Sequence, residues 1–508
     1  MRSMKLVDRP VMLYSLLGSL AAVLLLPLLL IPLNSDNDTY QAMAFAMDQG
    51  KGLPYIGSWD QNFPGIVFYH WLSIKLFGLS DVAFRIVDLL NQVAIALIAF
   101  AITRKYVSLN AALVAVPLSV ILYLGYGFWM VGQRDTFATT WLLLALYLIL
   151  DEKRNAQRIL LAGACIALAT FIRPTLLIFA ALIFANASAW KLLLRDAGLL
   201  ILGMFVTLLL CMLPWLVTPG GVHEFITATI HFNKDVYGPH SREPFSYFFR
   251  TFDVFTPLYV IVAVMLCATL FIARYRKIGV PLMIFVFCGA VGIFAMGKFH
   301  VYHYAIYLPL VAILFAFALG TVLPKPHFAI TLAIALAVGV YYYPARVAAQ
   351  FVKGGLTAET YERIANNLAS YPHLGREQES DVIRYLKSKD LQPSDVEFFL
   401  LWPGLQWRSG YLSDSRFTTT FALSMEGANG QTAYQREWLK EVTAMLKNTH
   451  PKYLVSAVGP PHVFTFSRFS SDSLLHHDEG IRNIMSEFYQ PDTAIAGFRV
   501  YRLNDATH

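Results

Sequence analysis

Charged residues are scarce in this 508-residue chain, because Asp, Glu, Lys and Arg together make up only 14% of it, while hydrophobic residues make up 56%. The charges lie between long apolar runs, and the mean hydropathy is +0.52. A soluble globular protein has a charged share of about 25%. The composition therefore excludes a soluble chain and predicts a membrane protein.

Cysteine is also scarce, and its positions exclude a disulfide framework. The chain has four cysteines, all of them in apolar runs: Cys165, Cys211, Cys267 and Cys288. The C-terminal part of the chain has none, so no disulfide pattern can be predicted there.

Nucleic-acid-binding motifs are absent from the sequence as well. The net charge of +7 and the pI near 9.0 are accounted for by Lys and Arg in the short connectors between apolar runs, where they orient a membrane protein. We therefore expect a membrane and no nucleic acid among the partners.

The first apolar run, at about residues 11–33, is longer than the core of a signal peptide and has no small-residue cleavage pattern after it. It is interpreted as a retained transmembrane helix. Arg2, Lys5 and Arg9 precede it and predict a cytoplasmic N-terminus, which places the next loop outside the cytoplasm.

Further apolar runs predict about eleven transmembrane spans in all. After the first, these lie at about 83–103, 111–128, 136–150, 159–172, 174–190, 198–217, 256–273, 279–296, 303–323 and 328–343. Successive connectors between spans alternate between the two sides of the membrane. With this count, the basic connectors fall on the cytoplasmic side, namely those with Arg104, Lys105, Lys153, Arg154, Arg158, Lys191, Arg195, Arg274, Arg276, Lys277 and Lys325. A single kinked helix across Arg173 and Pro174 would invert the membrane orientation of every later segment and break the pattern of basic connectors. Two spans are therefore predicted there.

The tail after about residue 360 is less apolar and predicts a soluble α/β domain outside the cytoplasm. Strands are predicted at 396–402, 416–421, 453–457 and 498–503, and helices at 361–368, 380–388 and 436–447. We expect this domain to support the protein or bind an acceptor rather than to catalyse. His462, His476 and His477 are too scattered to predict a metal site.

The polar loop at 34–78 is the strongest functional feature, because it places Asp36, Asp38 and Asp60 at a membrane surface. Aromatic residues, two glycine-bounded turns and a Pro-Gly step accompany the acids, a composition typical of a folded functional loop rather than a connector. The alternative is that the acids only keep the loop solvated.

Other ionisable residues lie where predicted helices meet the same outer surface: Arg134, Asp135, Arg173, Lys298, His300 and His303. Singly, each is explained by interfacial snorkelling or a local pair such as Arg134 with Asp135. Together, cations beside carboxylates would suit a phosphate-bearing lipid donor. The cations would hold the leaving phosphate, and a carboxylate would accept the proton of the incoming hydroxyl.

Over about residues 11–345 the chain resembles the polytopic GT-C glycosyltransferases, specifically the bacterial branch related to protein mannosyltransferases and lipid A aminoarabinose transferases. The matching residues are an acid and an aromatic in the first loop, a G-x-x-Y step, an acid before Pro-Gly, an Arg after the loop, an acid that starts the fourth span, and a late HYxxxxxP motif. They are Asp36, Tyr40, Gly52, Tyr55, Asp60, Pro64, Gly65, Arg85, Asp135, His303, Tyr304 and Pro309.

This resemblance implies a GT-C fold of about eleven transmembrane helices, and transfer of a sugar, usually with inversion, from a polyprenyl-phosphate carrier to a lipid, glycan or protein acceptor. It implies that Asp36 is the catalytic base, with Asp38 as the alternative. It also implies that Asp60 shapes the site or binds a metal, and that Asp135 orients the acceptor or the loop. No cofactor is certain, although Asp36 and Asp60 could hold a divalent ion.

One position departs from the family pattern. Many relatives have Lys before the Pro-Pro or Pro-Gly step, where it contacts the donor phosphate, whereas this chain has Asn62 there. Neutral Asn cannot balance a departing phosphate, so phosphate binding would fall to other basic residues. The candidates are Arg134, Lys298, His300, His303 and Arg242.

The sequence thus predicts a transmembrane module at 1–345, which includes the outer loop 34–80, and an extracytoplasmic α/β domain at 346–508, in the cytoplasmic (inner) membrane. A secondary transporter or lipid flippase is the alternative, although the sequence has no internal repeat that would support it. A structural subunit of an envelope assembly is a third reading, in which the loop acids could be lost without consequence.

Overall fold

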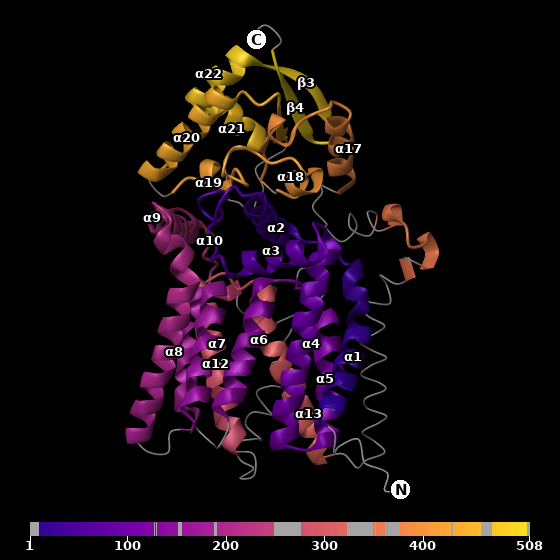
Figure 1. The fold of residues 1–508 in the computed structure, drawn as a ribbon, viewed down its shortest axis with the longest axis vertical. Helices are drawn as coiled ribbons and strands as arrows, with labels where there is room; N and C mark the ends of the chain where they lie inside the picture. Colours follow the sequence, from indigo (N-terminus) through magenta and orange to yellow (C-terminus); the bar gives the residue numbers. More distant parts are fainter. Residues whose placement is uncertain are drawn as a thin grey trace. The chain divides into compact units, whose positions relative to one another are not determined.

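The chain forms two compact units in the computed structural model (Figure 1). The helical unit consists of residues 1–32, 84–212 and 243–356, and the loop–tail unit consists of residues 33–83, 213–242 and 357–508. The structure describes residues 10–125, 128, 130–150, 155–186, 190–247, 276–322, 349–350, 352–360, 363, 376–401, 403–427, 430–458 and 470–504.

Apolar helices build the helical unit. They are α1 (Pro10–Leu25), η2 (Leu26–Leu30), α4 (Asp81–Tyr106), α5 (Leu109–Gly125), α6 (Arg134–Ile149), α7 (Ala156–Ile172), η3 (Pro174–Asn186), α8 (Trp190–Val217), α12 (Arg276–Met296), η7 (Val301–Tyr307) and α13 (Leu308–Val322). Every predicted span except 256–273 and 328–343 coincides with one of these segments, and those two lie outside the described residues.

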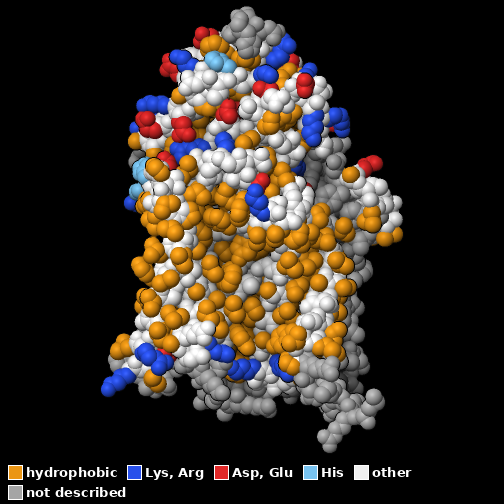
Figure 2. Space-filling view, in the orientation of Figure 1, with side chains coloured by type: hydrophobic (Ala, Val, Ile, Leu, Met, Phe, Trp, Pro, Cys, Tyr) orange, Lys and Arg blue, Asp and Glu red, His pale blue; other side chains and the backbone are white. Residues whose placement is uncertain are grey.

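Four of the described helices are long and apolar enough to cross a membrane: Pro10–Leu30, Asp81–Tyr106, Lys191–Val217 and Ile278–Met296. Hydrophobic side chains cover the visible face of the helical unit in Figure 2. On α8, Ile201, Phe205 and Leu210 are each 63% exposed, which suits contact with lipid rather than water. Lys and Arg gather at the lower end of the helices in that view (Figure 2), as the basic connectors predict.

The break at Arg173 is confirmed. Helix α7 ends at Ile172, Arg173 is extended with φ −151° and ψ 109°, and η3 starts at Pro174. Proline disfavours a helical conformation in the residue before it, so two segments form rather than one kinked helix.

The loop–tail unit combines the first loop with the C-terminal tail. Its helical segments are α2 (Ser35–Asp48), α3 (Gly65–Phe77), α9 (Gly221–Ile226), η4 (Thr227–His231), η5 (Asn233–Tyr237), α10 (Gly238–Ser241), α17 (Arg376–Lys387), η8 (Pro393–Asp395), α18 (Gly404–Ser409), α19 (Phe421–Ser424), α20 (Ala433–Thr449), α21 (Ser471–His477) and α22 (Glu479–Phe488). The division differs from the predicted boundary at residue 345, because the loop packs with the tail through the polar contacts described below.

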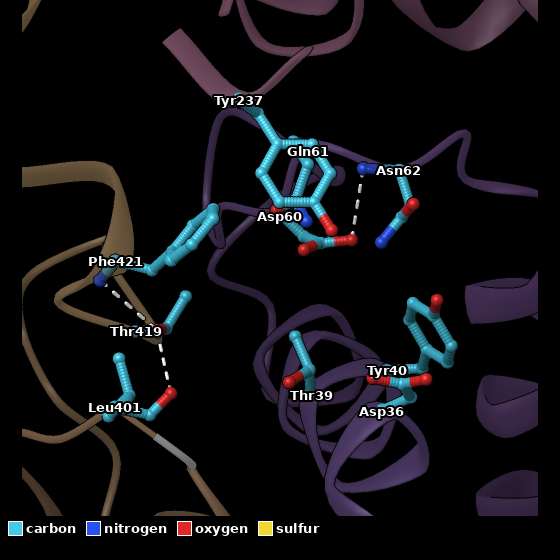
Figure 3. A pocket seen from close by; sticks show the side chains of 10 residues that line it. All are labelled: Asp36, Thr39, Tyr40, Asp60, Gln61, Asn62, Tyr237, Leu401, Thr419 and Phe421. Carbon is cyan, nitrogen blue, oxygen red and sulfur yellow. Dashed lines mark hydrogen bonds between the residues drawn. The ribbon is translucent and has the colours of Figure 1, made fainter. Parts of the chain in front are cut away.

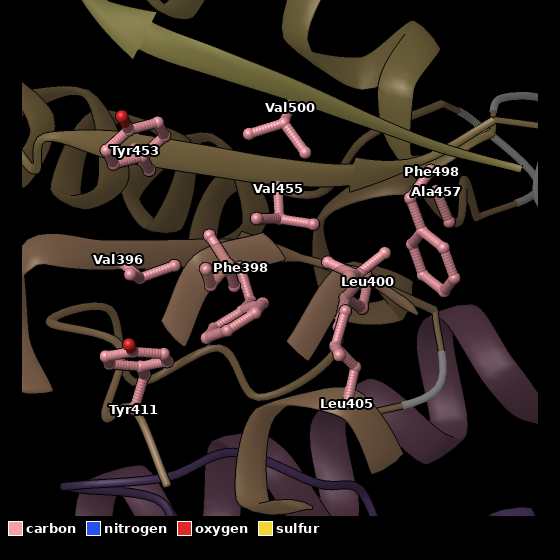
Figure 4. Packing of buried hydrophobic residues seen from close by; sticks show 12 residues of the cluster. Val396, Phe398, Leu400, Leu405, Tyr411, Tyr453, Val455, Ala457, Phe498 and Val500 are labelled. Carbon is pink, nitrogen blue, oxygen red and sulfur yellow. The ribbon is translucent and has the colours of Figure 1, made fainter. Parts of the chain in front are cut away.

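A four-stranded sheet lies in the tail, with the order β1 (Val396–Phe399), β2 (Tyr453–Ala457), β4 (Phe498–Leu503), β3 (Tyr489–Ile495). Strands β1 and β2 are parallel, and β4 runs antiparallel to both β2 and β3. Figure 4 shows the buried cluster on this sheet, in which Phe398, Val455 and Val500 pack with Leu405 of α18.

The predicted strands at 396–402, 453–457 and 498–503 correspond to β1, β2 and β4, whereas β3 was not predicted. The strand predicted at 416–421 is wrong, because residues 416–420 are irregular and Phe421 begins α19. The threonines there use their side chains to bond backbone carbonyls instead of joining the sheet. The helices predicted at 380–388 and 436–447 correspond to α17 and α20, and the one at 361–368 falls almost entirely outside the described residues.

Candidate functional site

A pocket of about 90 Å³ lies within the loop–tail unit and contains two of the predicted acids, Asp36 and Asp60. Four parts of the unit line it, as Figure 3 shows: the start of α2, the loop that follows Trp59, η5 and the tail. The lining residues are Asp36, Thr39, Tyr40, Asp60, Gln61, Asn62, Tyr237, Leu401, Thr419 and Phe421.

The start of α2 presents Asp36 to this pocket. Asn34 caps the helix by accepting a hydrogen bond from the Asn37 backbone at 3.1 Å, so Asp36 lies in the first turn. The helix dipole favours negative charge at this position. Tyr40 is one turn further along and lies beside Asp36 in the pocket wall (Figure 3).

Asp38, the alternative base, has different partners. Its Oδ1 atom accepts hydrogen bonds from Arg408 Nη2 at 2.5 Å and from Trp407 Nε1 at 3.2 Å. Asp38 is only 8% exposed and is not among the described residues that line the pocket. The structure thus gives Asp36 and Asp38 different surroundings.

Asp60 lies in a tight loop that the rest of the unit holds in place. Its Oδ2 atom accepts a hydrogen bond from the Asn62 backbone at 3.0 Å, and the Asn62 carbonyl accepts one from Tyr55 Oη at 2.6 Å. Asn233 donates to the Gln61 carbonyl at 2.7 Å, and Thr418 donates to the Trp59 carbonyl at 2.8 Å. Asp60 itself is only 4% exposed, so its carboxylate has a defined direction.

An aromatic cluster supports this loop from behind. Trp59 is fully buried, and its ring packs edge-on against Phe232 at 4.9 Å and Trp438 at 5.3 Å between centroids. Phe417 and Trp438 also pack together, at 5.6 Å. Such pairs stabilise the core beyond the area they bury, so they help to hold the Asp60 loop in place.

The other predicted acid, Asp135, lies in the first turn of α6 in the helical unit. It is completely buried and forms an ion pair with Arg173, and its Oδ2 atom is 3.5 Å from His303 Nδ1. Arg134, Lys298 and His300 are close enough to act electrostatically on His303. The helical unit therefore brings the predicted cations, Arg173 among them, together around His303.

Arg242, the remaining predicted phosphate binder, belongs to the loop–tail unit. It follows α10 in an extended conformation and is exposed. It is not among the described residues that line the pocket.

Four lining residues lie outside the loop at 34–78 that the sequence indicated: Tyr237, Leu401, Thr419 and Phe421. Three of them come from the tail, which we expected only to support the protein or bind an acceptor. The run of threonines at 418–420 was the available signal, but the stretch 416–421 was predicted to be a strand instead.

Among the described residues, no group of three or more His, Cys, Asp or Glu could hold a metal ion. The pocket nevertheless offers two carboxylates beside amide and hydroxyl oxygens, which are ligands that hard divalent cations accept. A cation there would need further oxygen ligands from water or substrate phosphate.

Part of the chain matches a known protein family. Residues 61–217 match the family model of dolichyl-phosphate-mannose-protein mannosyltransferase. No curated protein matches the chain significantly in sequence.

Solved structures with the same fold cover nearly the whole chain. ArnT from Cupriavidus metallidurans bound to undecaprenyl phosphate has 14% identity and a TM-score of 0.59, with 96% of this chain and 97% of that chain covered. The Archaeoglobus fulgidus oligosaccharyltransferase in complex with Zn and sulfate has 15% identity and a TM-score of 0.52, with 95% and 73% covered. The archaeal oligosaccharyltransferase AglB from Archaeoglobus fulgidus, in complex with an inhibitory peptide and a dolichol-phosphate, has 12% identity and a TM-score of 0.51, with 98% and 75% covered.

The resemblance to polytopic GT-C glycosyltransferases is therefore confirmed. Together with the apolar helices, this fold implies a membrane location.

Proposed function

We propose that the chain is an integral membrane glycosyltransferase that moves a sugar from a polyprenyl-phosphate carrier to a lipid, glycan or protein acceptor at the extracytoplasmic face. The observation that carries this proposal is the pocket shared by Asp36 and Asp60. It is supported by the family model, and by the undecaprenyl phosphate and dolichol-phosphate in the ArnT and AglB structures.

In the proposed mechanism Asp36 is the general base. The acceptor hydroxyl oxygen forms a bond to the anomeric carbon while the bond from that carbon to the carrier phosphate breaks and its electron pair leaves with the phosphate. The hydroxyl proton passes to Asp36. A single displacement of this kind inverts the anomeric configuration.

Asp38 is the weaker candidate for this role. An opposite charge favours the ionised form of a carboxylate, and Arg408 lies 2.5 Å from Asp38. Asp38 binds Arg408 and Trp407 and is not among the described residues that line the pocket, whereas Asp36 faces the pocket (Figure 3).

The leaving phosphate would be bound by basic side chains. We assign this role to Arg134, Lys298, His300 and His303, and keep exposed Arg242 as a further candidate. Asp135 would orient Arg173 and His303, with which it is in contact. The positive charge stabilises the phosphate as it gains negative charge in the transition state.

A divalent cation, if bound, would be held by Asp36 and Asp60 and would polarise an oxygen of the substrate. Asp60 is otherwise a positioning residue for the pocket wall. Both assignments rest on the two carboxylates in one pocket.

The test is release of free polyprenyl phosphate from a polyprenyl-phosphate sugar by the purified protein, with an envelope extract as the acceptor. We expect Asp36→Asn to abolish release and Asp38→Asn to reduce it only partly. Asp48→Asn is the matched control, since Asp48 lies on the same helix but pairs with Lys75 at 2.6 Å. No release by well-folded wild type from several donors would contradict the proposal and favour a transporter or flippase.

A further inference from the structure

We propose that Arg408, in the tail, is a positioning residue that fixes the direction of Asp36 by holding the first turn of α2. This inference rests on the proposed function, in which Asp36 is the base. It concerns a residue outside the region that resembles known glycosyltransferases in its motifs.

Arg408 contacts three carboxylates. Its Nη2 atom is 2.5 Å from Asp38 Oδ1 and 3.9 Å from Asp81 Oδ1, and its Nη1 atom is 2.6 Å from Glu379 Oε2. All four side chains are at most 13% exposed. A planar guanidinium can bond several carboxylates at once, which a lysine ammonium cannot do with the same geometry.

Two of these carboxylates hold the chain on either side of Asp36. Asp81 Oδ1 accepts a hydrogen bond from the Leu33 backbone at 2.8 Å, immediately before the cap of α2. Asp38 lies in the first turn itself. Arg408 therefore contacts both Asp81, which binds the residue before the helix cap, and Asp38, which lies in the first turn. Asp36 lies between Leu33 and Asp38 in the chain.

Neighbouring residues are fitted to this contact. Trp407 bonds Asp38 through Nε1 and lies under the guanidinium, 4.6 Å from ring centroid to Arg408 Cζ. A Cβ atom at Gly404 would come within 2.1 Å of Arg408 Nη1 and 2.9 Å of Asp38 Oδ2, so any other residue at this position would displace the ends of these side chains.

Loss of Arg408 would leave three carboxylates close together without their shared cation, and they would repel one another. The first turn of α2 would then shift or loosen, and Asp36 would lose its alignment with the acceptor hydroxyl. A small misalignment of a reacting group can cost about 100-fold in rate. Arg408 is not among the described residues that line the pocket, so the effect should fall on kcat rather than on KM for the lipid donor.

The first experiment compares polyprenyl phosphate release by wild type, Arg408→Lys and Arg408→Gln, each checked for thermal stability. We expect kcat to fall about tenfold or more in Arg408→Lys and further in Arg408→Gln, with the KM for the donor nearly unchanged. Arg384→Lys is the matched control, because Arg384 is an exposed tail residue paired with Asp381 at 3.0 Å. Wild-type kcat in both Arg408 variants would overturn the proposal.

A second experiment needs no turnover, which separates failure of this inference from failure of the proposed function. Hydrogen–deuterium exchange of the full-length protein is followed at the amides of residues 35–41. We expect faster exchange there in Arg408→Lys than in wild type or Arg384→Lys, with exchange in β2 unchanged. Unchanged exchange in α2, or equal acceleration throughout the tail, would overturn the positioning role.

Discussion

Lys51 of the first loop and Glu397 of β1 both bind the backbone of residues 413–415 in the tail, Lys51 through its carbonyl groups and Glu397 through its amide groups. Lys51 Nζ donates hydrogen bonds to the carbonyls of Ser413, Asp414 and Ser415. Glu397 Oε2 accepts from the backbone of Asp414 at 2.8 Å and of Ser415 at 3.2 Å. Burial raises the pKa of Glu397 to about 7 and lowers the pKa of Lys51, so the loop–tail contact contains two titratable groups.

Glu397→Gln should flatten the pH dependence of stability. A carboxyl whose pKa is raised on folding contributes stability that is fully present below its ordinary pKa of 4.5 and is lost as the pH rises through about 7. The shift corresponds to roughly 3 kcal/mol. The unfolding temperature in detergent can be followed by Trp fluorescence from about pH 4.5 to 8. It should fall as the pH rises across this window in wild type and change less in the variant. Parallel curves would contradict this assignment.

Lys51→Met should weaken the contact between the first loop and the tail. The substitution leaves three partly buried carbonyls without their shared donor, at a cost of about 1–3 kcal/mol. We expect a lower unfolding temperature and faster proteolysis in the loop at residues 49–58. Lys75→Met is the control, because Lys75 has a half-exposed side chain in a surface ion pair with Asp48. This variant should lose less than about 1 kcal/mol of stability. Equal effects in the two variants would refute this prediction.

Gly163→Ala and Gly203→Ala should each disrupt the contact between α7 and α8. A Cβ atom at Gly163 would lie 2.2 Å from the Leu200 carbonyl oxygen, and one at Gly203 would lie 2.2 Å from the Leu160 carbonyl oxygen. Backbone cannot move aside as a flexible side chain can, so we expect a loss of at least about 1–3 kcal/mol. The yield of monodisperse protein in size-exclusion chromatography measures the effect.

Gly198→Ala is the control for that experiment, because a Cβ atom there has no atom within 4 Å outside its own helix and chain neighbours. Alanine also favours helix over glycine by about 1 kcal/mol. Gly198→Ala should therefore retain or improve the yield, and a similar loss in all three variants would contradict the packing argument.

The helices and part of the tail could be predicted from the sequence because their patterns are local. An apolar run of about 20 residues predicts a span whatever it packs against. Strand β3 was missed because Gln490, Pro491 and Asp492 are polar or break the ladder, and such residues occur on edge strands. The stretch 416–421 was assigned wrongly because side-chain bonds from Thr418 and Thr419 replace those of a sheet.

The candidate site could be predicted only in part, for a related reason. Motif spacing indicated Asp36 and Asp60, which share the pocket, but could not separate Asp36 from Asp38. That separation depends on Arg408, which is 370 residues away from Asp38 in the chain. Local patterns do not indicate which distant residues will meet, so the contribution of the tail became visible only in the structure.

Asp60→Asn should reveal whether the pocket works with a divalent cation. An amide oxygen can still accept the hydrogen bond from the Asn62 backbone, so the loop should keep its shape while the pocket loses one of its two carboxylates. If Asp36 and Asp60 hold a cation, chelation should slow polyprenyl phosphate release by wild type, and Asp60→Asn should need about tenfold more cation for half-maximal release. Manganese binding, followed by electron paramagnetic resonance without any substrate, should weaken to the same extent. If chelation has no effect and Asp60→Asn releases phosphate at the wild-type rate, the carboxylate charge of Asp60 has no role, and Asp36 acts without a metal.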